Sequence, residues 1–208
     1  TPTYGNRDKF TIKVKSQINE GNGANTSSWF FSNNHIGTHF DSPNHFFEKG
    51  KKTKDYKAED FCFYNISIIE KKCEEGNLID LDNDDLNDID IETDFLIIKT
   101  GYGNFRGTDK YHNDNPGLVS TLASVLKKRF KKIRAVGFDF ISLTSWNHRE
   151  HGKLSHKEFL GESNNILIVE DMDLSQIDKD SKLNNLIMAP LRTIDGNGAP
   201  VTIICDKL

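Results

Sequence analysis

The sequence predicts a single α/β domain, and three observations support this class. Short apolar runs of the kind found in buried strands occur at residues 95–99, 134–140 and 165–171. An amphipathic segment at residues 118–130 has the spacing of a helix. The chain has 208 residues, close to the size of one domain, and shows no linker, internal repeat or low-complexity stretch. Strands interleaved with a helix indicate a layered α/β architecture over residues 1–208.

The N-terminal half begins with a predicted strand in which apolar and polar residues alternate. The apolar positions are Phe10, Ile12 and Val14, so we expect one face of this strand to be buried. Glycine and asparagine at residues 20–25 predict a turn, and residues 61–70 predict a further strand. The acidic tract that follows lacks the pattern of an EF-hand, so we expect a solvated helix or loop there and no calcium site.

The clearest helix in the sequence follows the Pro-Gly pair at residues 116–117. Leu118, Leu122, Val125 and Leu126 recur at helical spacing, and basic residues in the last turn complement the helix dipole. After two further apolar runs, the chain closes with an apolar segment, a glycine turn and a final strand.

Composition excludes several classes of partner. The net charge is −4, so no overall positive field attracts nucleic acid, and the basic run at 127–132 is interpreted as a helix terminus. No apolar stretch approaches the ~20 residues that cross a bilayer, and residues 1–10 contain no signal-peptide core, so we expect no membrane association and a soluble cytoplasmic protein. The three cysteines form no CxxC pair and are expected to pack as ordinary residues.

A cluster of ligand-type side chains carries the functional signal. His35, His39 and His45 fall within eleven positions, with Asp41 between the last two. Imidazole and carboxylate groups suit Zn²⁺, Mn²⁺ or Fe²⁺, and histidines four apart can face one ion. Because Gly37 permits unusual backbone angles and a proline follows, we expect a loop or broken turn that gathers these ligands.

Further ligands for such a metal have to come from elsewhere in the chain. The HExxH pattern of zinc proteases is excluded because Ile36 follows the first histidine. Glu170 ends an apolar strand and His156 lies fourteen residues earlier, and both are candidates. From the residues alone, His156 could equally lie on a helix surface and Glu170 at a solvated strand end.

The cluster resembles the signature of a known family. The sequence HIGTHFDSPNHF at residues 35–46 is similar to the HxGTHxDxPxHF motif of the metal-dependent cyclase family, which includes bacterial kynurenine formamidases and isatin hydrolases. The resemblance extends over nearly the whole chain, through the segments FLIIKTGYG, VGFDFISL, SHKEFLG, ILIVED and MAPLRTIDGNGAPVTII. Two departures are Asp171, where asparagine is frequent, and Ala189, where leucine is usual.

The resemblance implies a fold and a role for each residue of the motif. It implies a compact domain of the swivelling β/β/α type, assembled as a homodimer or homotetramer. The metal ligands that it implies are His35, His39, Asp41, His156 and Glu170. Asp41 would bridge the ions in binuclear members, and His45 would be the catalytic histidine.

The implied activity is metal-dependent hydrolysis of a small aryl amide. By resemblance, the first hypothesis is an arylformamidase that converts N-formyl-kynurenine to kynurenine. One or two Zn²⁺ or Mn²⁺ ions would activate water, and His45, with an ordinary pKa near ~6.5, would move the proton to the departing amine. The aromatic residues near the motif stack on an aryl substrate or belong to the core; they are Tyr4, Trp29, Phe30, Phe46 and Phe47.

Two alternatives remain open from the sequence. A ring-opening hydrolase of a cyclic amide or lactone, such as isatin, would use the same metal and a different pocket. A non-catalytic protein would use the metal as a structural element, with a closed shell of protein ligands.

Overall fold

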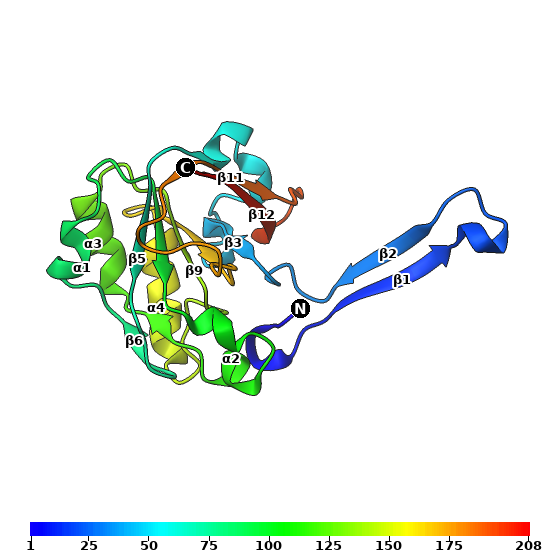
Figure 1. Cartoon of the computed structure of the whole chain (residues 1–208), viewed down its shortest axis with the longest axis horizontal. Helices are drawn as coiled ribbons and strands as arrows, with labels where there is room; N and C mark the ends of the chain where they lie inside the picture. The colour runs from blue at the N-terminus through cyan, green and yellow to red at the C-terminus, as the bar shows by residue number, and fades with distance from the viewer.

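The computed structural model describes residues 1–208 and is built around one eight-stranded mixed sheet (Figure 1). Its strand order is β4-β11-β12-β3-β10-β9-β7-β5. These strands are β3 (His39–Asp41), β4 (Cys62–Phe63), β5 (Ile66–Glu70), β7 (Phe95–Lys99), β9 (Ala135–Phe138), β10 (Leu167–Glu170), β11 (Leu183–Pro190) and β12 (Gly198–Lys207). Strands β5, β7, β9 and β10 are parallel, whereas β3 runs antiparallel to both β10 and β12.

Smaller elements complete the chain. They are the paired strands β1 (Phe10–Ser16) and β2 (Thr26–Phe31), the paired strands β6 (Leu78–Ile79) and β8 (Gly117–Leu118), and the helices α1 (Asn83–Asn87), α2 (Asp109–Asn113), α3 (Thr121–Arg129) and α4 (Arg149–Leu160). None of the helices has the length and apolar character needed to span a bilayer.

The parallel strands separate two apolar cores because their side chains alternate between the faces of the sheet. On β7, Leu96 and Ile98 enter the core shared with α3 and α4, and Phe95 and Ile97 enter the core on the opposite face. The opposite core also contains Phe40 of β3 together with residues of β4 and β11. The predicted α/β domain is therefore confirmed, with helices on one face of the parallel strands and the β3, β4 and β11 part of the same sheet packed on the other.

The elements expected from apolar periodicity are present, with shifted bounds. The runs at 95–99, 134–140 and 165–171 form β7, β9 and β10, which are buried throughout apart from the last residue of β7. The helix begins at Thr121, and Leu118 lies in β8 instead. The predicted strand at 61–70 is divided into β4 and β5, and the acidic tract holds β6 and α1. All three cysteines are free and half-buried, as expected.

Two local predictions are wrong. The first strand has no buried face, since Ile12 and Val14 are 54% and 62% exposed. Strands β1 and β2 form a separate hairpin that projects from the body (Figure 1). The histidine segment, expected as a loop or broken turn, contains strand β3 followed by a 3-10 turn at Pro43–His45. Pairing with β10 and β12 holds this segment extended.

The packing of α3 gives a first prediction. Leu126 is fully buried against the sheet, whereas Val125 on the same helix is 42% exposed. We expect Leu126→Ala to lower the free energy of unfolding by about 2–5 kcal/mol, through lost burial and a residual cavity. Val125→Ala is the matched control and should change it by less than about 1 kcal/mol. Urea unfolding measures both, and equal losses would contradict this orientation of the helix.

Candidate metal centre

The register between β3 and β10 brings the first candidate ligands together. His39 is paired with Glu170, and Asp41 with Ile168. Because side chains two apart on a strand share a face, His39 and Asp41 lie on one face of β3 while Phe40 enters the core on the other. Glu170 shares its face of β10 with Ile168, which packs in the helix-side core. All three polar side chains therefore point toward the layer that contains α4.

Helix α4 supplies the fourth group, His156, from that layer. Its ring is 4% exposed and stacks on Phe46, with ring centroids 4.6 Å apart. The helix lies close to Thr144, and a Cβ at Gly152 would come within 2.2 Å of the threonine hydroxyl. Glycine at this position therefore allows the approach that carries His156 to the carboxylates.

Both buried histidines are oriented in the way typical of metal ligands. The Nδ1 atom of His39 bonds the Gly37 carbonyl and that of His156 bonds the Gly152 carbonyl, each at 2.8 Å. These bonds fix the rings and leave Nε2 facing the carboxylates. The Nε2 atom of His39 is buried and forms no hydrogen bond. A buried nitrogen without a partner calls for an explanation, and a metal ion would provide one.

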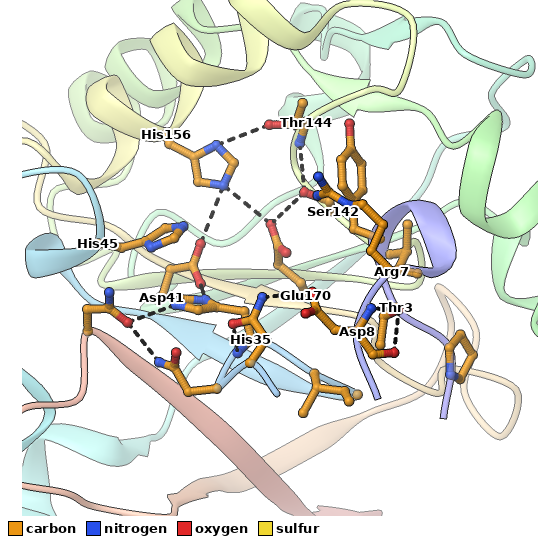
Figure 2. Close-up of a pocket in the computed structure, with 18 of the residues that line it drawn as sticks. Thr3, Arg7, Asp8, His35, Asp41, His45, Ser142, Thr144, His156 and Glu170 are labelled. Carbon is orange, nitrogen blue, oxygen red and sulfur yellow. Dashed lines mark hydrogen bonds and ion pairs between the residues drawn. The ribbon is translucent and has the colours of Figure 1, made fainter. Parts of the chain in front are cut away.

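The two carboxylates each face both histidines. Figure 2 shows His156 with dashed lines to both Asp41 and Glu170. His39 Nε2 lies 3.6 Å from Asp41 Oδ1 and 3.3 Å from Glu170 Oε2. His156 Nε2 lies 3.4 Å from Asp41 Oδ2 and 3.5 Å from Glu170 Oε1. Two donors that bind one ion at about 2.0–2.2 Å in a tetrahedral shell are about 3.3–3.6 Å apart. The donor spacing therefore fits a divalent ion. One oxygen of Asp41 faces His39 and the other faces His156.

The remaining histidines complete two potential ligand groups that share Asp41. His35, His39 and Asp41 form one, and Asp41, His45 and His156 form the other. His35 Nδ1 is 2.6 Å from Asp41 Oδ1, and its ring stacks on His45 at 4.0 Å. The structure thus brings all six residues named from the sequence into one cluster, although their roles as ligands or catalysts remain predictions.

The burial of His156 and Glu170 decides between the two interpretations that the sequence left open, which are a metal site and a solvated surface position. His156 lies on a helix but is buried, and Glu170 is 4% exposed and accepts a hydrogen bond from the Leu143 amide at 2.7 Å. Neither residue is therefore a solvated surface group. Asp171, the departure from the usual asparagine, does not line the pocket and instead bonds Arg106 and Tyr111.

The cluster lies at the base of a cavity of about 420 Å³, and most of the residues that line this cavity are polar. His35, Asp41, His45, His156 and Glu170 all line it. Among the aromatic residues considered above, Tyr4 and Phe46 line this cavity, whereas Trp29 and Phe30 are exposed on the projecting hairpin. A substrate could therefore reach the candidate ligands from solvent.

Sequence reasoning missed several groups that hold the cluster in place. Asn197, from the β11–β12 connection, lies with its Oδ1 2.9 Å from His35 Nε2. Gly198 lies so close to the same ring that a Cβ would come within 2.5 Å of it. The pattern DGNG at residues 195–198 predicts only a turn. Arg7 and Arg149 at the cavity mouth were also missed, because single arginines outside a motif give no signal.

Burial and charge set the protonation of the metal-free cluster. Burial acts to lower the pKa of His39 and His156, but the adjacent carboxylates of Glu170 and Asp41 outweigh it and raise the values to about 9 and about 10. The same contacts hold the carboxyl pKa values of Asp41 and Glu170 below their usual range, despite burial. Burial lowers the pKa of His45 to about 4, so His45 is neutral at pH 7.

The fold and this cluster define an α/β domain with a group of histidine and carboxylate side chains that could hold a metal ion. The sequence profile of the Cyclase family matches residues 1–145. The chain therefore belongs to the Cyclase family.

Relatives and solved structures agree with this assignment. An uncharacterized protein of Methanocaldococcus jannaschii is 28% identical over 170 residues, which are 82% of this chain and 77% of that protein. Isatin hydrolase A from Labrenzia aggregata, bound to benzyl benzoate, has a TM-score of 0.78 at 20% identity, over 95% of this chain and 82% of its own. A predicted metal-dependent hydrolase from Bacillus stearothermophilus has a TM-score of 0.72 at 21% identity, over 98% of this chain and 91% of its own. The two solved structures show that the fold is shared.

The raised imidazole pKa values predict that metal binding releases protons. At pH 7 His39 and His156 are protonated in the metal-free protein, and each has to lose a proton to bind an ion. We expect the affinity for Zn²⁺ or Mn²⁺ to rise with pH up to these pKa values, with about two protons released per protein at pH 7.

Isothermal titration calorimetry in buffers of different ionisation enthalpy measures this number. His148→Gln removes an exposed histidine outside the cluster and should leave it unchanged. An affinity that does not depend on pH would contradict the assigned protonation.

Proposed function

We propose that the chain is a metal-dependent hydrolase of a small aryl amide, with N-formyl-kynurenine as the first substrate to test. The observation that carries this proposal is the cluster of buried imidazoles and carboxylates at the base of an accessible cavity. Membership of the Cyclase family and the likeness to an isatin hydrolase and a metal-dependent hydrolase support it. The ion is Zn²⁺ or Mn²⁺, in one or two copies, since this donor set suits both.

The chemistry requires an activated water and a group that receives charge on the carbonyl oxygen. A bound divalent ion supplies both by lowering the pKa of water and acting as a Lewis acid. The residues that would hold the ion or ions are His35, His39, Asp41, His156 and Glu170. The hydrogen bonds from the two Nδ1 atoms to backbone carbonyls keep the buried imidazoles pointed at it.

His45 is the proposed group for proton transfer. It lines the cavity, stacks on His35 and lies 5.9 Å, ring to ring, from His156. Its neutral imidazole is the form that can accept a proton from water and then donate it to the departing amine. Its lowered pKa makes it a weaker base than the ordinary histidine assumed from the sequence. Tyr4 and Phe46, which also line the cavity, would contact the aryl group.

Ring opening of a cyclic amide such as isatin is the second candidate. The likeness to isatin hydrolase A at a TM-score of 0.78 favours it, and it would use the same cluster. Hydrolysis of formyl-anilides, isatin and small lactones with added Zn²⁺ or Mn²⁺ separates the candidates. A purely structural metal is disfavoured because such sites are closed, whereas this cluster faces a cavity.

The role of His45 gives a direct test. We expect His45→Ala to lower kcat by about 10²–10⁴-fold, because proton transfer is lost, while the bound metal per chain stays at the wild-type level. Turnover of formyl-anilides and metal analysis of the same sample measure the two quantities. His45 also lies within reach of Asp41 and His156, so loss of metal together with activity would make it a ligand.

Removing the ion provides the matching control. A chelator should abolish hydrolysis by the wild-type protein, and Zn²⁺ or Mn²⁺ should restore it. Full activity after metal removal would contradict the proposed mechanism.

We also propose that the predicted homodimer or homotetramer forms through the β1–β2 hairpin. Cross-strand pairing places Phe10, Ile12, Phe31 and Trp29 on one face of this hairpin, where Ile12 and Trp29 are 54% and 63% exposed. A two-stranded hairpin is marginal on its own, and an apolar face of this kind is unfavourable in water. The hairpin, residues 10–31, carries two lysines and one glutamate, whereas the whole chain is acidic, so the body of a second copy is a complementary partner.

The assembly can be tested on the two faces of the hairpin. Trp29→Lys should shift the chain toward the monomer, because it places a charge in the apolar contact. Phe30→Lys, on the opposite face, is the control and should leave the assembly intact. Size-exclusion chromatography with light scattering measures the mass. A wild-type chain that is already monomeric would overturn the proposal.

A further inference from the structure

Arg7 and Arg149 differ from every other arginine in the chain. The chain has six arginines, and four of them donate to carboxylate, amide or carbonyl oxygens. These partners are Asp171 for Arg106, Asn87 for Arg129, and backbone carbonyls for Arg134 and Arg192. Arg7 and Arg149 have neither a carboxylate nor a carbonyl partner, and both line the cavity above the candidate metal centre.

Aromatic rings hold both guanidinium groups at the mouth of this cavity. Arg149 lies over the Trp146 ring with its Cζ 3.9 Å from the centroid, and Arg7 lies 5.9 Å from the centroid of Tyr4. The two rings contact each other, with centroids 5.2 Å apart. This arrangement places two positive charges along one wall. In Figure 2, Arg7 and His45 appear on opposite sides of the Asp41 and Glu170 carboxylates.

The nearby acidic groups are already engaged. Asp8, which also lines the cavity, accepts hydrogen bonds from Ser32 and Asn33. Lys153, the third cation of the lining, pairs with Glu150 at 2.7 Å. Arginine–carboxylate ion pairs are formed by Arg106 and Arg134, and neither Arg7 nor Arg149 forms one. A planar guanidinium binds a carboxylate through two parallel hydrogen bonds, so a carboxylate is the ligand group that suits them best.

We propose that Arg7 and Arg149 bind a carboxylate of the substrate, so that the enzyme prefers aryl amides that carry an acidic group. This inference rests on the proposed hydrolase function, and it names the substrate class within it. The scissile amide would face the candidate metal centre while the carboxylate lies at the cavity mouth. Arg149 and Arg7 are in this account specificity residues.

Ligand binding at the two arginines can be measured without turnover, because the fluorescence of a neighbouring tryptophan responds to it. It has two tryptophans, and Trp29 lies on the exposed hairpin, so Trp29→Phe leaves Trp146 as the single reporter beside Arg149. In the zinc-loaded protein, we expect anthranilate to change the Trp146 fluorescence and to bind at least about tenfold more tightly than the neutral anthranilamide, the usual scale of a charge-assisted contact.

Variants then assign the preference to the arginines. Arg149→Gln should remove most of this difference, and Arg149→Lys should keep more of it because the charge remains. Lys157→Gln removes an exposed charge about two turns further along α4 that does not line the cavity, so it is the matched control and should keep the whole difference in affinity. An equal affinity of the wild-type protein for the acid and the amide would overturn the inference, as would an Arg7→Gln/Arg149→Gln variant that retains the preference.

Kinetics provide the second readout. The substrates are N-formylanthranilate and the neutral formanilide. Arg149→Gln should raise the KM of N-formylanthranilate relative to that of formanilide by about tenfold, without a matching change in the ratio of the two kcat values. A ratio of KM unchanged in the double variant contradicts the inference. If anthranilate binds as expected but no amide is hydrolysed, the carboxylate site stands and the proposed function fails.

Discussion

The structure of the candidate site depends on the burial of two carboxylates beside each other. Asp41 and Glu170 are 1% and 4% exposed, and taking a charge of this kind out of water costs several kcal/mol unless positive charge or hydrogen bonds offset it. In the protein without metal, protonated His39 and His156 provide the offset. A divalent cation would provide more charge in the same space. The side chains are thus arranged so that a cation stabilises the fold at the place where it would act.

The sheet makes this arrangement possible by separating its two faces. Phe40 and Val169 pack into the core on one face, while their neighbours His39, Asp41 and Glu170 face α4 on the other. Shifting the register between β3 and β10 by one residue would move the polar side chains into an apolar core. The apolar packing behind the site therefore fixes the register on which the metal cluster depends. In the proposed function the cavity would serve two tasks, with the candidate metal donors and the two arginines lining different parts of it.

Much of this could be predicted from the sequence, for identifiable reasons. The buried parallel strands have a continuous apolar pattern, and His35, His39, Asp41 and His45 are close in the chain, so both signals are local. Placing His156 and Glu170 beside them required the family resemblance, because their approach depends on the packing of α4 and on strand register. The alternation of apolar and polar residues in the first strand predicts one buried face. Such a pattern shows that the strand is amphipathic, but the pattern does not show which surface covers its apolar side. The supporting groups Asn197 and Leu143 act through a turn and a backbone amide, which residue types do not reveal.

The central claim is that one cluster of side chains from β3, α4 and β10 holds a divalent cation. Anomalous diffraction at the zinc or manganese absorption edge, on crystals of the metal-loaded protein, tests it most directly. The account predicts anomalous density within about 2.0–2.2 Å of His39 Nε2 or His156 Nε2 and of an oxygen of Asp41. Anomalous density only at sites away from these atoms, in a protein that retains its metal and its fold, would contradict it.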